Sequence, residues 1–153
     1  MIRYRPAIAA DVPTLLQMLQ GLAEHDGSTS AAVASEASLL QHGFGRRPLF
    51  WAMIAEDAAQ PLGMAIYYPD YSTHRGQPGV YVQDIFVADT ARGLGVGRGL
   101  LAQLMHAQDW QAQYLTLGVS ADNAIARGFY QRLGFRVRGY EFLIIDGSEL
   151  EAL

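Results

Sequence analysis

The residues best suited to chemistry form one glycine-rich stretch, Arg92-Gly93-Leu94-Gly95-Val96-Gly97-Arg98. This stretch follows the apolar run 80–87 and opens a segment with helical periodicity, 96–107. Glycine lets a backbone come close to a ligand, and the first amides of a helix have no partner within that helix. With the positive end of the helix dipole and two arginines, these amides predict a site for a phosphate-bearing molecule.

The spacing of the glycines distinguishes between phosphate-binding loops. A dinucleotide loop needs glycine at its first, third and sixth positions, but the sixth residue from Gly93 is Arg98 and the sixth from Gly95 is Leu100. A nucleoside-triphosphate loop ends in Gly-Lys-Ser/Thr, and this chain has no lysine. The pattern that remains is Arg-x-x-Gly-x-Gly between a strand and a helix. The alternative is a glycine-rich turn that merely joins the two elements.

Composition excludes several classes of function. With 153 residues, of which 50% are hydrophobic, the chain can bury one sizeable core, so we expect a single domain over 1–153. A net charge of −4 argues against nucleic acid or an anionic membrane as the main partner. The absence of cysteine and of a histidine pair at helical spacing predicts no metal site. No leader or membrane-spanning segment is recognisable, so we expect a soluble cytoplasmic protein.

Strand-like and helical segments alternate along the rest of the chain, which predicts a mixed α/β or α+β domain. The expected strands are 2–5, 49–56, 62–68, 80–87, 114–119, 135–138 and 140–145, and the expected helices are 12–23, 35–42, 96–107 and 123–133, with polar loops at 26–34 and 71–79. Within 80–87, the adjacent polar residues Gln83 and Asp84 break the alternation. Such a break indicates a bulge, whereas the alternative is an ordinary edge strand.

Together, the glycine loop and its flanking elements resemble the acyl-CoA diphosphate loop of the GNAT superfamily of N-acetyltransferases. Further motifs resemble its spermidine/spermine acetyltransferase-like branch, which includes polyamine and thialysine acetyltransferases: Leu39-Leu40-x-x-Gly43-Phe44-Gly45-x-x-Pro48, Tyr67-Tyr68 and Tyr81-x-x-Asp84-x-Phe86-Val87. The resemblance implies a mixed central sheet of about six to seven strands with about four helices, and a splayed strand at the CoA site. It also implies acetyl-CoA as co-substrate, no metal, and a homodimer.

The resemblance assigns residues to the cofactor. Ile85, Phe86 and Val87 are expected to line the pantetheine arm, with the Val87 N–H near the acetyl carbonyl. The residues expected to hold the diphosphate are Arg92, Gly93, Leu94, Gly95, Val96, Gly97 and Arg98. Asn123 matches a CoA-contacting asparagine, or it serves only as a helix cap. Tyr130 matches the tyrosine that protonates the departing CoA thiolate, or it belongs only to the core.

On the acceptor side, the branch usually has Glu-Asp where this chain has Gln83-Asp84. A primary amine must lose a proton before it attacks a thioester, and Gln83 can only form hydrogen bonds. Asp84 could orient a cationic amine or join a water relay. Asp26 matches an acidic residue that contacts the amine, and Tyr71 and Tyr81 are candidate pocket walls; solvated or packing roles are the alternatives. We expect Arg75 near the acceptor mouth, where it would favour an amine that also bears an anionic group.

These expectations combine into one function: an acetyl-CoA-dependent N-acetyltransferase that acts on a primary amine of a small molecule, such as a polyamine, diamine or lysine-like amino acid. Direct attack in a ternary complex is expected, because no cysteine or convincing Ser-His pair could carry the acetyl group. The alternatives are acetylation of proteins or peptides, and a CoA-binding sensor module without turnover.

Overall fold

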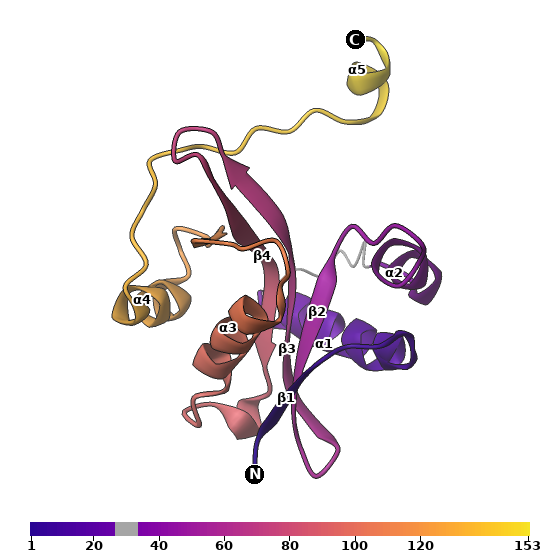
Figure 1. The fold of residues 1–153 in the computed structure, drawn as a ribbon, viewed down its shortest axis with the longest axis vertical. Helices are drawn as coiled ribbons and strands as arrows, with labels where there is room; N and C mark the ends of the chain where they lie inside the picture. The colour runs from indigo at the N-terminus through magenta and orange to yellow at the C-terminus, as the bar shows by residue number, and fades with distance from the viewer. Residues whose placement is uncertain (27–33) are drawn as a thin grey trace. The chain divides into compact units, whose positions relative to one another are not determined.

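The computed structural model describes residues 1–26 and 34–153, which form two compact units, Met1–Gly118 and Val119–Leu153 (Figure 1). The first unit contains β1 (Arg3–Pro6), α1 (Val12–His25), α2 (Glu36–Gly43), β2 (Trp51–Asp57), β3 (Gln60–Ser72), β4 (Gln77–Val87), α3 (Val96–Ala107) and β5 (Leu115–Leu117). Short 3-10 turns, η1 (Ala9–Asp11) and η2 (Asp89–Ala91), precede α1 and the glycine loop. The second unit contains α4 (Ala124–Leu133) and α5 (Gly147–Glu151).

The five strands form one mixed sheet in the order β1-β2-β3-β4-β5. The first four strands are antiparallel neighbours, whereas β5 runs parallel to β4. A parallel pair needs a long crossover connection, and α3 supplies it. Helix α3 covers one face of the sheet, and α1 and α2 lie on the other (Figure 1). The predicted mixed α/β class is therefore confirmed.

The core forms where α1 meets the sheet. The apolar positions of α1 recur at helical spacing. Leu15 and Met18 therefore pack against strand residues that point to the same face of the sheet: Ala52, Ile54, Met64 and Ile66. On α3, Leu100 and Leu104 are fully buried. Full burial of one such side chain stabilises the fold by about 1.5–3 kcal/mol. These contacts fix α1 on β2 and β3, and α3 contacts β3 and β4, the strands that carry the site.

Several predicted elements are confirmed, in particular those with local start and stop signals. Helix α3 has the predicted bounds, and α2 begins after Ser35, whose side chain accepts the Ser38 amide at 3.0 Å. Helix α4 begins after Asn123 and ends at Gly134, which has a φ of 100°. Such a left-handed residue is a common helix end. The predicted loop 26–34 falls largely on 27–33, which lie outside the described residues.

Three predictions are wrong in detail. The strands expected at 135–138 and 140–145 are not formed, so the sheet has five strands instead of six to seven. A strand needs a neighbour for its backbone hydrogen bonds, and the described part of the second unit contains no strand to pair with. The polar segment 71–79 is not a loop throughout, because β3 and β4 extend into it and pair as far as Ser72 and Gln77. Helix α5 was not expected.

Candidate functional site

Strand β4 carries a bulge at the point where its hydrophobic alternation breaks. Ile66 on β3 pairs with Asp84, whereas the next residue, Tyr67, pairs with Val82, so Gln83 is the extra residue. Strand β5 accompanies β4 only along Val80–Val82. The predicted irregularity is confirmed. Beyond Val82, the edge of β4 that faces away from β3 has no neighbouring strand among the described residues.

The open edge of β4 carries backbone groups that a ligand can reach. The Ala88 amide donates to the Leu62 carbonyl at 2.8 Å, so residue 88 points toward β3. Successive residues of a strand point their backbone groups to opposite edges, which directs Ile85 and Val87 to the open edge. An extended ligand could pair with these groups as an added strand does. The Val87 N–H thus lies where a polarised carbonyl could accept it.

The glycine loop connects this edge to α3. Gly93 and Gly95 both have a φ of 78°, a left-handed conformation that glycine adopts without strain. Within the part of the chain that the structure describes, no backbone acceptor takes the amides of Gly93 or of Gly95 to Arg98, whereas the Leu94 amide donates weakly to Ala91 at 3.4 Å. Unpaired amides at the start of a 12-residue helix form an anion site together with the helix dipole.

Two arginines flank these amides. Arg98 is exposed in the first turn of α3. The Arg92 guanidinium lies 2.7 Å from Nε2 of His25 and 3.0 Å from Oδ1 of Asp89. His25 was not predicted as a site residue, and its only local signal is its place in the last turn of α1.

Asp84 is a half-buried carboxylate on the α1 face of β4. It lies on the same face as Phe86, two positions along the strand, whose ring packs on the core beneath α1. Burial raises the pKa of Asp84, and the charge of Asp26 at the end of α1 raises that pKa further. No ion pair of Asp84 is present among the described residues. The structure thus brings together two of the predicted acidic residues, and an incoming cation would neutralise their repulsion.

Gln83 is held by a tyrosine that sequence reasoning did not assign to the site. The Tyr68 hydroxyl donates to Oε1 of Gln83 at 2.9 Å, and the Tyr68 ring stacks on Tyr81 with 5.2 Å between the centroids. This bond fixes the oxygen of the Gln83 amide toward Tyr68, and its NH2 group is left to donate to a neighbour. The only sequence signal for Tyr68 was the Tyr67-Tyr68 pair.

Tyr71 and Arg75 lie elsewhere on the β3–β4 hairpin. Tyr71 pairs with Pro78, five positions from Ile66 and therefore about 17 Å along β3 from the level of Asp84. Arg75 lies in the hairpin turn, with its guanidinium 5.6 Å from the centre of the Tyr114 ring. A cation in this position is attracted to the ring face. The structure thus places Arg75 in the hairpin turn and not beside Asp84, and its position near the acceptor mouth stays a prediction.

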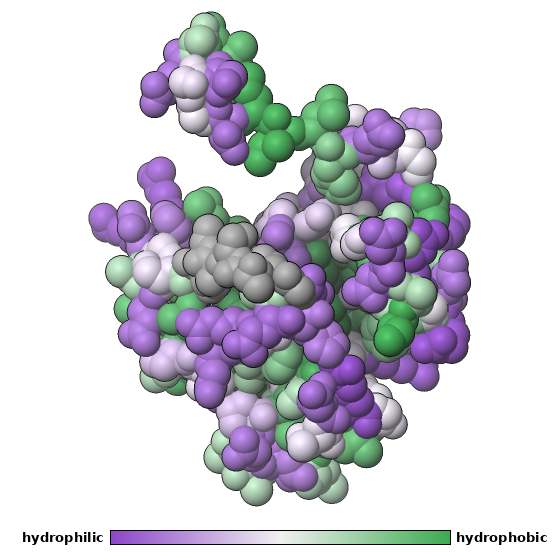
Figure 2. Space-filling model, turned by 180° about the vertical axis from the view of Figure 1, so that it is seen from behind, coloured by the Kyte–Doolittle hydropathy of each residue, from purple (hydrophilic) through white to green (hydrophobic). Residues whose placement is uncertain are grey.

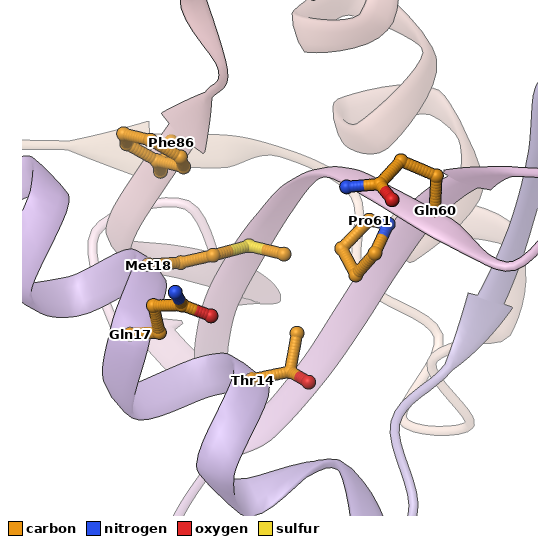
Figure 3. A pocket seen from close by; sticks show the side chains of 6 residues that line it. All are labelled: Thr14, Gln17, Met18, Gln60, Pro61 and Phe86. Carbon is orange, nitrogen blue, oxygen red and sulfur yellow. The ribbon is translucent and has the colours of Figure 1, made fainter.

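Phe86 separates two hollows on the α1 face. The first, of about 270 Å³, lies between α1, the start of β3 and the Phe86 ring (Figure 3) and is lined by Thr14, Gln17, Met18, Gln60, Pro61 and Phe86. The second, of about 360 Å³, lies farther along α1 and is lined by Gly21, Glu24, His25, Phe86, Ala88 and Asp89. Two of its lining residues, His25 and Asp89, contact Arg92, so the second hollow lies close to the start of the glycine loop.

The second unit holds the other two predicted residues. Asn123 caps α4, because its Oδ1 accepts the Ala126 amide at 3.1 Å. Tyr130 is buried on the same helix, with its ring 5.2 Å from Phe129 and 5.4 Å from Phe135 in edge-on contacts. Burial raises the pKa of Tyr130 to about 12, so the phenol keeps its proton at neutral pH. Capping and packing roles are thus present, and contact with a ligand stays a prediction.

Other kinds of site find no support in the described residues. Among them, no group of three or more histidine, aspartate or glutamate side chains could hold a metal ion. None of the helices in the described ranges has the length and apolar character that crossing a membrane requires.

Comparisons with known proteins agree on one family. The model of the acetyltransferase (GNAT) family matches residues 16–135. Thialysine N-epsilon-acetyltransferase of Bos taurus is 30% identical over 99% of this chain and 96% of its own length. Spermidine/spermine N(1)-acetyltransferase-like protein 1 of Homo sapiens is 36% identical over 67% of this chain, but over only 16% of its own length.

Solved structures support the fold alone. An integron cassette protein from the mobile metagenome of V. cholerae has a TM-score of 0.79 at 22% identity, covering 99% of this chain and 96% of that one. A ribosomal-protein-alanine N-acetyltransferase from Brucella melitensis biovar Abortus 2308 has a TM-score of 0.73 at 18% identity, covering 96% of this chain and 100% of that one.

Proposed function

Because the chain belongs to the GNAT acetyltransferase family and is an acetyl-CoA-dependent N-acetyltransferase, we propose that it acetylates a primary amine of a small molecule. The observation that carries the proposal is the set of amides without a backbone acceptor, those of Gly93 and of Gly95 to Arg98, directly beside the open edge of β4. The amides and the two arginines would hold the diphosphate of acetyl-CoA. Ile85 and Val87 would hold the pantetheine arm along the edge.

The open edge would then place the thioester for direct attack. The Val87 N–H would donate to the carbonyl oxygen, on which negative charge develops as the amine nitrogen bonds to the carbonyl carbon. As the carbon–sulfur bond breaks, the Tyr130 hydroxyl would give its proton to the thiolate. The family match runs from residue 16 to residue 135 and so continues past Gly118 through Asn123 and Tyr130, and we propose that 1–153 act as one domain.

The acceptor side favours a cationic amine with a second polar group. Asp84 and Asp26 would bind the ammonium. Asp84 would accept the proton that the ammonium loses and would pass it to water. Gln83, with its oxygen engaged by Tyr68, would donate to a carbonyl or carboxylate of the substrate. We therefore propose a lysine-like amino acid as the acceptor, in keeping with the names of the thialysine N-epsilon-acetyltransferase relatives.

Release of free CoA thiol tests this proposal. The purified chain is mixed with acetyl-CoA and with lysine, thialysine, spermidine or a lysine-containing peptide in parallel. We expect thialysine or lysine to give the highest kcat/KM. Efficient turnover of spermidine alone, or of the peptide alone, would contradict the acceptor class. Binding of acetyl-CoA without release of thiol from any amine would favour a sensor module instead.

We also propose that the chain forms a homodimer. The support is the C-terminal segment 137–145, which exposes large apolar side chains, including Val137 at 82% and Leu143 at 93%. An apolar surface of this kind favours association.

A further inference from the structure

His25 and Arg92 meet although they lie 67 residues apart in the chain. His25 is the last residue of α1, and Arg92 opens the glycine loop. The Nη2 atom of Arg92 lies 2.7 Å from Nε2 of His25 and 3.0 Å from Oδ1 of Asp89. One guanidinium nitrogen therefore contacts both partners.

The chemistry of these groups fixes the direction of the bond. A guanidinium has donors only, so Arg92 donates and Nε2 of His25 accepts, which requires a neutral imidazole with its proton on Nδ1. Nη2 donates one hydrogen to His25, and the same nitrogen forms the ion pair with Asp89. The three remaining N–H groups, on Nε and Nη1, have no acceptor within the described ranges 1–26 and 34–153. The guanidinium is thus tied at one nitrogen and available at the other two.

Packing places His25 where it can do this. A Cβ added at Gly21 would lie 3.2 Å from the Phe86 ring, so glycine at this position allows α1 to approach β4 closely. His25 lies one turn beyond Gly21 on the same helix face. The close approach therefore brings the end of α1 to the start of the loop, where His25 and Asp89 line one hollow.

We infer that His25 is a positioning residue, which holds the Arg92 guanidinium ready for the diphosphate of acyl-CoA. The inference rests on the proposed function, because it takes the glycine loop as the diphosphate site. An arginine side chain loses much rotamer entropy when it is fixed on a ligand, and fixing it beforehand raises affinity. A neutral imidazole orients the guanidinium without adding a negative charge that would repel the diphosphate, as Asp89 alone would.

Two substitutions of His25 distinguish the contribution of its acceptor nitrogen from that of its ring. His25→Phe keeps a ring but has no acceptor, and His25→Gln keeps an acceptor oxygen but has no ring. His106→Phe, at an exposed position in the last turn of α3, is the matched control. Calorimetry with CoA should give a Kd about tenfold higher for His25→Phe, because the pre-organisation of one long side chain is lost. His25→Gln and the control should stay within about twofold.

A second readout shows whether the effect passes through the diphosphate. Acetyl-pantetheine has the thioester and the arm but no diphosphate, so its kcat/KM should be the same for His25→Phe and the wild type. With Arg92 already replaced by alanine, His25→Phe should no longer change the Kd for CoA.

Two results would overturn the inference while the proposed function stands: a wild type that binds CoA with the same Kd as His25→Phe, or an equal loss with acetyl-pantetheine. A wild type that does not bind CoA would overturn both.

Discussion

At the scale of single residues, the site holds a carboxylate in surroundings that disfavour its charge. Burial and the neighbouring Asp26 both raise the pKa of Asp84, and no cation of the described chain compensates for them. A group of this kind costs stability and is usually retained for function. Gln83, the bulge residue, cannot accept a proton. The adjacent Asp84 is therefore our candidate for the group that accepts the proton of the amine.

Replacement of Asp84 by asparagine should therefore stabilise the protein and impair the reaction. An acid whose pKa is higher in the folded state binds more protons when folded, so stability falls as pH rises through the interval between the two pKa values. The cost is fully present once the pH lies above the raised pKa of the folded state. Asp84→Asn should therefore raise the Tm at pH 7 and lower kcat/KM at least about tenfold. The gain in Tm should disappear at about pH 3, where aspartate is protonated in the unfolded chain.

Asp146→Asn is the matched control, because Asp146 is exposed and makes no side-chain bond at the start of α5. Equal Tm and kcat/KM in Asp84→Asn and this control would contradict the role of Asp84.

Tyr130 should matter through its hydroxyl and not through its packing. Burial raises its pKa to about 12, so the phenol stays protonated and able to donate throughout pH 6–9. Tyr130→Phe keeps the ring contacts with Phe129 and Phe135. We expect kcat to fall about 10- to 100-fold with little change in Tm. Tyr140→Phe, at an exposed tyrosine of the same unit, should leave kcat unchanged; a full kcat in Tyr130→Phe would exclude proton donation by this residue.

At the scale of elements, a charged network fixes α1 against the sheet. Arg5 on β1 donates to both carboxylate oxygens of Asp11, at 2.7 and 2.9 Å, and to Glu56 on β2 at 3.1 Å. Asp11 also accepts the Ile8 amide at 2.7 Å. Strand β1, the start of α1 and strand β2 are thus tied at one point, and α1 in turn carries Asp26 and His25 to the site.

The network should make stability depend on pH. The hydrogen bond from Arg5 lowers the pKa of Asp11, so its contribution is fully present above the usual aspartate pKa and is lost as pH falls through the lower folded value. Arg5→Met should destabilise the protein by about 1–2 kcal/mol at pH 7 and by less in acid. Urea unfolding at pH 7 and pH 3 measures both values. Arg3→Met, at an exposed arginine of the same strand, is the control, and equal losses at the two pH values would be evidence against the mechanism.

Sequence alone predicted the elements whose signals are local. The Gly95–Val96 start of α3 and the Asn123 and Gly134 ends of α4 depend on residues within one turn. Apolar alternation at 135–145 favours an extended backbone, but a strand also requires a partner from elsewhere. The polar composition of 71–79 predicted a loop. Composition does not reveal that β3 and β4 pair with each other in this segment, so the prediction was wrong there.

The candidate site divides in the same way. Its glycine loop and its bulge follow from adjacent residues, and both were predicted. Contacts between distant parts of the sequence were not predicted. His25 and Arg92 are separated by 67 residues, and Tyr68 and Gln83 by 15. Both require knowledge of how α1 and β3 lie beside β4.

At the scale of the whole molecule, the C-terminal segment 137–145 exposes apolar side chains that a single chain does not bury. Tyr140 is 72% exposed and Ile144 is 87% exposed, and apolar side chains gather along the extended stretch before α5 (Figure 2). At about 25 cal/mol per Å², the burial of several such side chains against a second copy would provide much of the driving force for a dimer. The proposed homodimer thus predicts that charge in this stretch breaks it.

The double substitution Leu143→Glu with Ile144→Glu should convert the dimer to a monomer, because two carboxylates would have to be buried for association. Sedimentation equilibrium of the wild type should give twice the chain mass of 16.7 kDa, and the double variant should give that mass once. Leu153→Glu, at an apolar residue that is 92% exposed outside the stretch, should remain dimeric. A monomeric wild type at about 100 μM, far above the Kd of a stable dimer, would refute the homodimer, and a dimeric double variant would place its interface on another surface.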